Sequence, residues 1–546
     1  MINEVDLPIG WISCLLEDVF EWTSGGTPTS SVNEYYDNGS IPWLNISDLN
    51  DGIVSSSAKH ITESGLNASS AKMVDANSIL IAIYGSIGKL GINTIPVSTN
   101  QGICFTKNFP SKMNNKFLFY YLLSIRNKLI NLGKGGTQQN ISQTVLNSVE
   151  FKFPSLNEQN RIVDKIETLF SEVDAGIANL TLAKRQLEQY RQSLLKHAFE
   201  GKLTAKWREK HGKALPLPSA DELLEQIQTA RQDYYDQQMA DWEQAVQDWE
   251  EQGKEGTKPR KPSKLEDIKV INKTELSTIL PSYWSEQYLE SISIISGGLT
   301  KNASRKVLEE QVPYLRVANV HANELRLDDI SYIGIKESEK PRTLLQENDL
   351  LIVEGNGSIE HIGRVALWTG EIHPCYHQNH LIKARIFEVV EPKYILYFLL
   401  SATGRERIVK VASSTTGLHT LSLSKVSNLI IPLTSLAEQK QIIELLESKL
   451  SDSERLVDDI DTQLKKANLL KTSILHKAFQ GKLVPQDPND PPASELLAQI
   501  KAEREAKALA EKQAKQDKAV SKSKAKTKSA KTSKQAKKDE QITLPL

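Results

Sequence analysis

Two short segments carry amide, hydroxyl and basic side chains of the types that bind nucleic-acid bases and phosphates. Residues 134–142, KGGTQQNIS, contain two glycines followed by Thr, two Gln and Asn, and residues 413–422, SSTTGLHTLS, hold the corresponding place later in the chain. Glycine lets a backbone approach a ligand closely, Gln and Asn can form two hydrogen bonds with adenine, and Lys can bind a phosphate. A polar turn before a strand explains the first segment equally well. The candidate contacts are Lys134, Thr137, Gln138, Gln139, Asn140, Thr416 and His419.

Two further pairs of segments offer similar chemistry. A glycine turn follows an apolar run at residues 84–89, YGSIGK, and again at 354–364, EGNGSIEHIGR. Neither has the Walker spacing, in which Lys is followed by Ser or Thr, so a simple hairpin turn is the alternative to a phosphate contact. The candidates from these turns are Lys89, Asn356, Ser358 and Arg364, and those from the third pair of segments are Asn100, Gln101, Gln378, Asn379 and His380.

Residues 373–380, HPCYHQNH, could supply nitrogen and sulfur ligands to zinc, because they hold three His and one Cys. The matching segment of the first half has no His, so a fold shared by both halves does not need a metal. We therefore expect a loop and a strand here, and predict no metal ligands.

The sequence offers no catalytic apparatus. The Asn-Pro-Pro-Tyr/Phe motif of methyltransferases is absent, and the nearest string, NDPP at residues 489–492, lacks the aromatic residue. We find neither a glycine-rich dinucleotide loop nor a helicase motif. We predict that the chain has no catalytic residues and binds no cofactor of its own.

An internal repeat positions all of these segments. LNEQNRIV at 156–163 matches LAEQKQII at 436–443, an offset of 280 residues (436 minus 156), and LLKHAFEGKL at 194–203 matches ILHKAFQGKL at 474–483 with the same offset. ADELLEQI at 220–227 also matches ASELLAQI at 493–500, and fainter matches lie upstream, such as PWLNI at 42–46 with PYLRV at 313–317. The chain is therefore a duplicated unit.

Each repeat contains a long helix. Apolar residues recur at steps of three and four over residues 157–199 and 437–479, and a glycine follows each at 201 and 481. At ~1.5 Å per residue each helix is roughly 60 Å long. Its apolar stripe must be buried, and each copy is the obvious partner of the other. We predict a pseudo-two-fold architecture, in which two α/β (α+β) domains are separated by two long antiparallel helices that form a coiled coil.

The expected segments follow from these patterns. They are 1–152, the first variable domain; 153–205, the first helix; 206–270, a polar helical insertion and linker; 271–432, the second variable domain; 433–484, the second helix; and 485–546, a linker, a short helix and a basic low-complexity tail.

Composition sets broader limits. The net charge is −1, although the stretch from Lys501 to Glu540 holds fourteen Lys and Arg against six Asp and Glu, so charge alone does not indicate DNA binding. The three scattered cysteines, Cys14, Cys104 and Cys375, fit a reducing compartment. With no signal peptide and no apolar run long enough for a membrane span, we expect a cytoplasmic protein.

The duplicated helix motifs, Leu-x-Glu-Gln at the start and Ala-Phe-x-Gly-Lys-Leu at the end, resemble those of the specificity subunits of type I restriction-modification systems. The resemblance covers the chain up to about residue 500. It implies that each variable domain is a target-recognition domain that reads one half of a split double-stranded DNA site, and that the helices set the unread spacer. Because the two domains differ in sequence, the two half-sites should differ too.

The resemblance also implies partners. Two modification subunits, which bind S-adenosylmethionine and methylate adenine, would dock on the helices, and restriction subunits that use ATP and Mg would join them. The motif residues are candidate contacts for these partners: Glu158, Gln159, Phe199, Lys202, Glu438, Gln439, Phe479 and Lys482. The alternative is a coiled-coil adaptor that binds only proteins, which the acidic balance of residues 1–500 favours.

Overall fold

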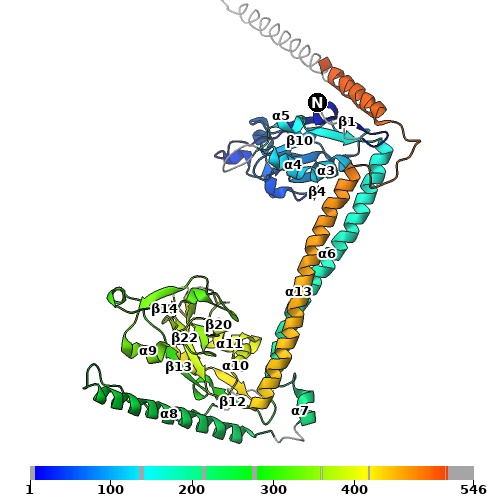
Figure 1. Ribbon diagram of the computed structural model, residues 1–546. Coiled ribbons are helices and arrows are strands. Elements are labelled where there is room, and N and C mark those ends of the chain that lie inside the picture. Colours follow the sequence, from blue (N-terminus) through cyan, green and yellow to red (C-terminus); the bar gives the residue numbers. More distant parts are fainter. Residues whose placement is uncertain are drawn as a thin grey trace, which may run out of the picture. The chain divides into compact units, whose positions relative to one another are not determined.

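The computed structural model describes residues 7–133, 140–211, 217–272, 280–356, 358–359, 361–415, 418–510 and 512–513. The chain forms two compact units, one of Met1–Leu180 with Thr462–Leu546 and one of Thr181–Asp461. Two helices of 44 residues, α6 (Leu156–Phe199) and α13 (Leu436–Phe479), confirm the two long helices that the sequence predicts (Figure 1). Each unit contains one α/β domain with one end of α6 and the opposite end of α13, which confirms the duplicated fold class.

The first domain is built on a five-stranded sheet of order β2-β10-β7-β8-β4. The strands are β2 (Glu21–Ser24), β10 (Ile103–Lys107), β7 (Ile79–Ala82), β8 (Leu90–Asn93) and β4 (Gly52–Val54). A four-stranded sheet of order β5-β3-β9-β6 adjoins it: β5 (His60–Ile61), β3 (Ile41–Leu44), β9 (Val97–Thr99) and β6 (Met73–Val74). β1 (Ile12–Leu15) pairs with β11 (Glu150–Phe153).

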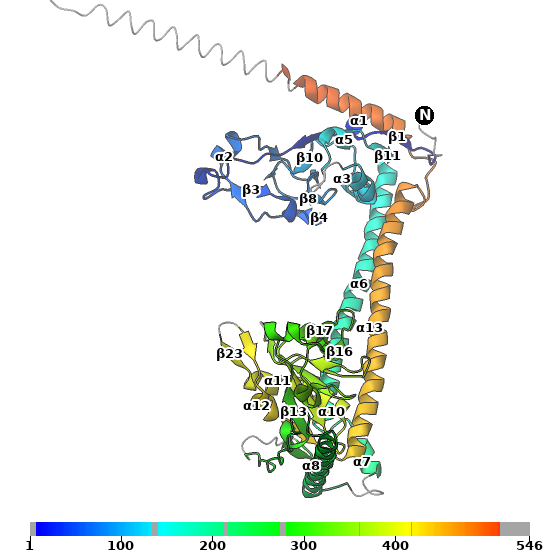
Figure 2. The ribbon, with the colours of Figure 1, turned by 60° about the vertical axis from the view of Figure 1, so that its left-hand side comes forward.

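Helices complete the first domain: α1 (Leu16–Val19), α2 (Glu63–Asn67), α3 (Asn115–Ser124), α4 (Arg126–Asn131) and α5 (Gln143–Asn147). α3 packs on the first turns of α6 (Figure 2), where Phe117 and Leu118 share one core with Ile162 and Ile166. The apolar face of α6 is therefore buried on its own domain at this end.

The second domain repeats this plan. Its central sheet has the order β13-β22-β18-β20, from β13 (Ser293–Gly297), β22 (Leu381–Ile386), β18 (Leu350–Val353) and β20 (Val365–Leu367). The next sheet is β17 (Ser331–Gly334), β14 (Gln311–Leu315) and β21 (Tyr376–His377). The small pairings join β12 (Ser285–Tyr288) to β25 (Ile430–Leu433), β15 (Val320–His321) to β16 (Glu324–Leu325), and β24 (Leu418–Thr420) to both β19 (Gly355–Asn356) and β23 (Ser413–Thr415). Its helices are α9 (Lys340–Thr343), α10 (Pro392–Leu400), α11 (Ala402–Val411) and α12 (Leu423–Ser427).

Ion pairs show that α6 and α13 run antiparallel within each unit. In the first unit Lys471 bonds Asp174. In the second, Arg191 Nη2 lies 2.9 Å from Glu454 Oε1, and Lys184 Nζ lies 2.6 Å from Asp461 Oδ1. Asp174 and Glu454 are equivalent under the 280-residue offset, as are Arg191 and Lys471, so the repeat preserves this contact between the helices.

The C-terminal end of each long helix packs into the core of the domain that precedes the other long helix. Phe199, which ends α6, packs against Tyr394 and Phe398 of the second domain, with ring centroids 5.1 and 5.3 Å apart. Phe479, which ends α13, packs against Phe117 and Tyr121 of the first domain, at 5.2 Å in both cases. The Ala-Phe-x-Gly-Lys-Leu motif therefore serves reciprocal packing.

The glycines of this motif allow the close approach. Gly201 and Gly481 have φ values of +71° and +68°. A Cβ at Gly201 would lie 2.6 Å from Pro281 Cγ, and one at Gly481 would lie 2.4 Å from Pro8 Cγ. Only glycine adopts this backbone and leaves room for the proline ring, which precedes β12 or β1.

Helices beyond the motif pack in the same reciprocal way. After α7 (Ala205–His211), α8 (Ala220–Glu251) buries Leu223 and Ile227, the latter in the core of the second domain. The helix over residues 493–510 buries Leu496 and Ile500 in the core of the first domain. No helix in the described part of the chain is long and apolar enough to cross a membrane.

Candidate nucleic-acid interface

In the first domain, candidate residues meet where two parallel strands end. β3 pairs with β9, with Leu44 opposite Thr99, so Asn45 and Asn100 are the next residues along each strand. The Asn100 backbone N–H donates to Leu44 O over 3.0 Å, and its side-chain Nδ2 donates to Asn45 Oδ1 over 3.2 Å. The half-buried pair of amides is thus held in a fixed arrangement at the end of the strands.

The glycine turn at residues 84–89 lies beside this pair of amides. Lys89 Nζ donates to the backbone oxygen of Ile46 over 3.4 Å, directly after Asn45. Tyr84 forms an isolated antiparallel bridge with Asn140, which brings in the end of the 134–142 segment. The exposed Gln101 accepts a hydrogen bond from the Thr27 hydroxyl. Lys89, Asn100, Gln101 and Asn140 therefore come together, although they span 52 residues (140 minus 89 plus one).

The second domain builds the same arrangement with other side chains. β14 pairs with β21 in parallel, with Leu315 opposite His377, so Arg316 and Gln378 occupy the places of Asn45 and Asn100. The Gln378 N–H donates to Leu315 O over 2.9 Å. Arg316 Nη2 donates to Asp329 Oδ2 over 2.7 Å and to Asp329 O over 3.0 Å.

Arg364 corresponds to Lys89. Its Nη2 lies 3.5 Å from the backbone oxygen of Val317, the first residue of the 3-10 turn η5 (Val317–Asn319), just as Lys89 reaches Ile46 at the start of η2 (Ile46–Asp48). The Nε atoms of Arg316 and Arg364 are buried and have no partner among the described residues. Two guanidinium groups thus stand where the first domain has an amide and an ammonium group.

Two histidines of the segment 373–380 lie in different environments near this region. His380 is exposed, and its Nδ1 lies 2.8 Å from Glu354 Oε2. His377 is fully buried and donates through Nδ1 to Thr343 O over 3.0 Å, while burial, with Lys383 nearby, lowers the pKa of His377 to about 3. Among the residues that the structure describes, no group of three or more His, Cys, Asp or Glu side chains could hold a metal ion.

Several predicted contacts lie outside the described residues or are only partly described. Lys134, Thr137, Gln138, Gln139 and Thr416 are outside them, and for Asn356 only the backbone, in β19, is described. Asn379 follows Gln378 and donates its N–H to Leu299 O over 3.0 Å. His419 lies in β24 opposite Asn356, and Ser358 lies in the turn after β19.

The Leu-x-Glu-Gln motif forms contacts inside the chain. Glu158 is 4% exposed and accepts a hydrogen bond from Trp11 Nε1 over 3.0 Å, and burial raises its pKa. Glu438 is fully buried and accepts from Trp284 Nε1 over 3.2 Å. Arg208 Nη1 also donates to Glu438, over 2.5 Å.

The glutamine of the motif fixes the start of a helix in each domain. Gln159 Oε1 accepts from the N–H of Asn114, the residue that caps α3, over 3.2 Å. Gln439 Oε1 accepts from the N–H of Glu391, which precedes α10, over 2.9 Å. Both glutamines are buried, as is Phe199, and Phe479 packs on the core. These six side chains therefore form contacts within the chain, whereas Lys202 and Lys482 are exposed, and partner binding by all eight motif residues stays a prediction.

Two pairs of residues near these sites were not predicted from the sequence. Trp11 and Trp284, the partners of the motif glutamates, follow Leu-Pro-x-x at residues 7–10 and 280–283, a match that could have identified them. Asn45 and Arg316 lie inside the faint match of PWLNI with PYLRV, but only the strand pairing shows that they adjoin the candidate contacts.

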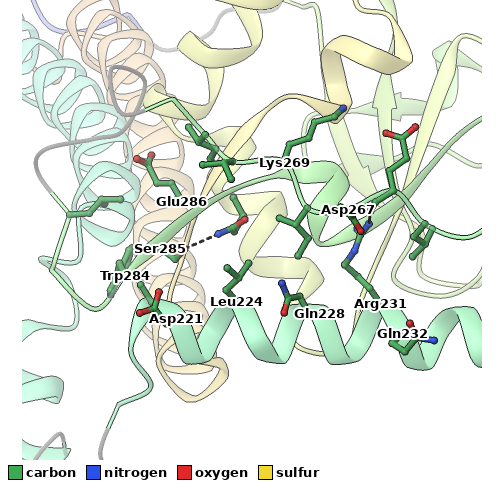
Figure 3. Close-up of a pocket in the computed structure, with 18 of the residues that line it drawn as sticks. Asp221, Leu224, Gln228, Arg231, Gln232, Asp267, Lys269, Trp284, Ser285 and Glu286 are labelled. Atoms are coloured by element: carbon green, nitrogen blue, oxygen red, sulfur yellow. Dashed lines mark hydrogen bonds between the residues drawn. The ribbon is translucent and has the colours of Figure 1, made fainter.

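A cavity of about 900 Å³ lies between α8 and the segments on either side of residues 273–279 (Figure 3). Three of its charged side chains, Arg231, Lys269 and Glu286, have partners in the chain. Arg231 Nη1 donates to Glu290 O over 2.9 Å, Lys269 Nζ lies 2.7 Å from Glu290 Oε1, and Glu286 Oε1 accepts from Arg407 over 2.7 Å. The Arg231 contact holds α8 to the second domain, so we place the candidate interface at the strand ends instead.

Comparison with known proteins yields one consistent result. The family model of the type I restriction modification DNA specificity domain matches residues 8–181 and 281–466, one match in each repeat. The specificity subunit of the type I restriction enzyme EcoKI from Escherichia coli K12 is 24% identical over 521 residues, which cover 92% of this chain and 97% of that subunit. The EcoBI specificity subunit from Escherichia coli is 22% identical over 508 residues, covering 91% and 93%. A solved chain from a study of complex assembly and conformational transition of the type I R-M system is 17% identical, covers 87% of this chain and 99% of its own length, and has a TM-score of 0.59, which shows the shared fold.

Proposed function

Because this chain belongs to the family of type I restriction-modification DNA specificity subunits, we propose that each of its two domains reads one half of a split DNA site. One observation carries the proposal. The two domains bring together the same set of positions at their parallel strand ends, yet the side chains there differ: Asn45 and Asn100 in one, Arg316 and Gln378 in the other. A common frame with different hydrogen-bonding groups suits two unlike half-sites.

The long helices would set the unread spacer. A helix of 44 residues is ~66 Å long, which exceeds one ~34 Å turn of B-DNA. The ion pairs between α6 and α13, such as Arg191 with Glu454, support a fixed register of the two helices where they pair.

The chain would act without catalysis of its own. Two modification subunits would dock on the helices near the repeated motifs, and Lys202 and Lys482 are the exposed members of the eight candidate contacts. S-adenosylmethionine would be bound by those subunits, and ATP and Mg by restriction subunits.

Genome-wide adenine methylation tests the proposal. We would sequence DNA by a single-molecule method from cells with the gene, without it, and with the gene restored. We expect one split motif with unlike halves and a fixed gap, which disappears on deletion and returns on restoration. Unchanged methylation in a host that expresses the modification subunit would contradict the proposal and favour a protein-binding adaptor.

A further inference from the structure

The two domains differ in chemistry at one equivalent position. Asn45 follows β3 and Arg316 follows β14, and each adjoins an amide residue, Asn100 or Gln378, that follows the neighbouring parallel strand. Both domains keep a basic side chain next to this position, because Lys89 and Arg364 each donate to the carbonyl of the first residue of a 3-10 turn. The position thus changes from a carboxamide to a guanidinium within a preserved frame.

Resting on the proposed function, we propose that this position determines one base in each half-site, and that Arg316 selects a guanine while Asn45 selects an adenine. The guanidinium of Arg matches the O6 and N7 acceptors of guanine, whereas the amide of Asn matches N6 and N7 of adenine. The family relationship alone does not name these bases.

The surroundings of Arg316 fix its guanidinium and leave the hydrogens of Nη1 for a ligand, because Nη2 bonds Asp329 and Nε is buried. Its Nη2 donates to both the carboxylate and the backbone oxygen of Asp329, which fixes the plane of the group. The Arg316 side chain is 29% exposed and that of Asp329 is 85% exposed, so the pair lies at the surface. A guanidinium held in one orientation loses less conformational entropy when it binds a base edge.

The surroundings of Asn45 are likewise fixed. Its Oδ1 accepts from Asn100 Nδ2 over 3.2 Å, and its backbone N–H donates to Asp48 Oδ2 over 2.7 Å. Asn100 Oδ1 in turn accepts from the Gly102 N–H over 3.1 Å. Among the described residues no group accepts from Asn45 Nδ2, so this donor remains for a ligand beside the exposed Gln101.

The test is a set of variants expressed in cells that lack the chromosomal gene and retain the modification subunit. Arg316→Ala, Arg316→Gln and Asn45→Ala are compared with the wild type by genome-wide adenine methylation. Arg326→Ala is the matched control, because it removes the same charge from the same domain, and Arg326 bonds Glu324 on the β15–β16 hairpin instead. Melting temperatures of the purified variant complexes show that each is folded.

We expect Arg316→Ala to relax one guanine position in one half-site by roughly 5- to 150-fold in discrimination, with the other half and the gap unchanged. Arg316→Gln should shift the preference at that position towards adenine, and Asn45→Ala should relax one adenine in the other half. Arg326→Ala should leave the motif intact.

Three results would overturn the inference. The first is an unchanged motif in the Arg316 variants, and the second is a change in both halves of the motif. The third is complete loss of methylation by variants that melt at the wild-type temperature, because that loss would assign Arg316 to assembly instead of base selection. Absence of any split motif in the wild type would instead contradict the proposed function itself.

Discussion

Replacing Phe199 by alanine should destabilise the second domain, although Phe199 belongs to the helix that follows the first domain. The ring is 4% exposed and forms edge contacts with Tyr394 and Phe398. Loss of a buried Phe costs about 3–5 kcal/mol, and the surrounding aromatic rings of α10 cannot refill its space without moving the helix. This cost should fall on the unit of Thr181–Asp461 alone.

Hydrogen exchange measured by mass spectrometry on the purified chain in its complex resolves the two units. Peptides from β18, β22 and α10 should exchange roughly 150- to 4,000-fold faster in Phe199→Ala where exchange occurs by opening of the whole domain, because each 1.4 kcal/mol is tenfold. Peptides from β7, β10 and α3 should be unchanged. Phe479→Ala is the matched variant and should give the reverse pattern, because Phe479 contacts Phe117 and Tyr121. Faster exchange in the first domain of Phe199→Ala would refute the reciprocal packing.

Three further predictions use other features. In the first, one helical turn is inserted between Gln186 and Leu195, together with a matched turn in α13. This change should lengthen the spacer of the methylated motif and leave both half-sites intact. An altered half-site would show that the helices do not set the spacer. Deleting the residues after Lys507 should leave the methylated motif unchanged in the same sequencing assay, because Leu496 and Ile500 still pack in the core of the first domain. A new motif would show that the tail takes part in recognition. Glu158→Gln should weaken the pH dependence of unfolding. Burial raises the pKa of Glu158, so the wild type gains stability as pH falls through the raised pKa towards the ordinary pKa of a carboxyl group, and its melting temperature should rise relative to that of the variant over that range.

The sequence allowed the duplicated architecture and both long helices to be predicted, because periodicity and repetition are local properties of the chain. Short apolar runs bounded by turn residues, at 78–84 and 349–353, also indicate buried strands, and they form β7 and β18. Leu and Tyr on one side predict helices over 114–132 and 391–411. Each region forms two helices instead, which meet at Ile125 and Ser401, the C-cap of the first helix and the N-cap of the second.

The site was predicted less completely, for physical reasons that particular residues show. Glu158 and Glu438 stand in a repeated motif, and repetition does not tell a surface contact from a buried one. Their burial depends on tryptophans 147 and 154 residues away. Arg316 was missed because its place beside Gln378 follows from a parallel strand pairing that no short-range pattern encodes.

The reciprocal packing of the helix ends also bears on how a gene of this kind can diverge. Residues in the repeated segments, such as Phe199, Gly201, Phe479 and Gly481, supply contacts that any inserted recognition domain must accept. A foreign domain that arrives by recombination between the two copies of the repeat would bring its own Leu-Pro-x-x-Trp start. Its proline would find room beside Gly201 or Gly481, whichever copy it joined. New DNA specificities could therefore be assembled by shuffling whole domains, without the slow co-adaptation that an unshared interface would require.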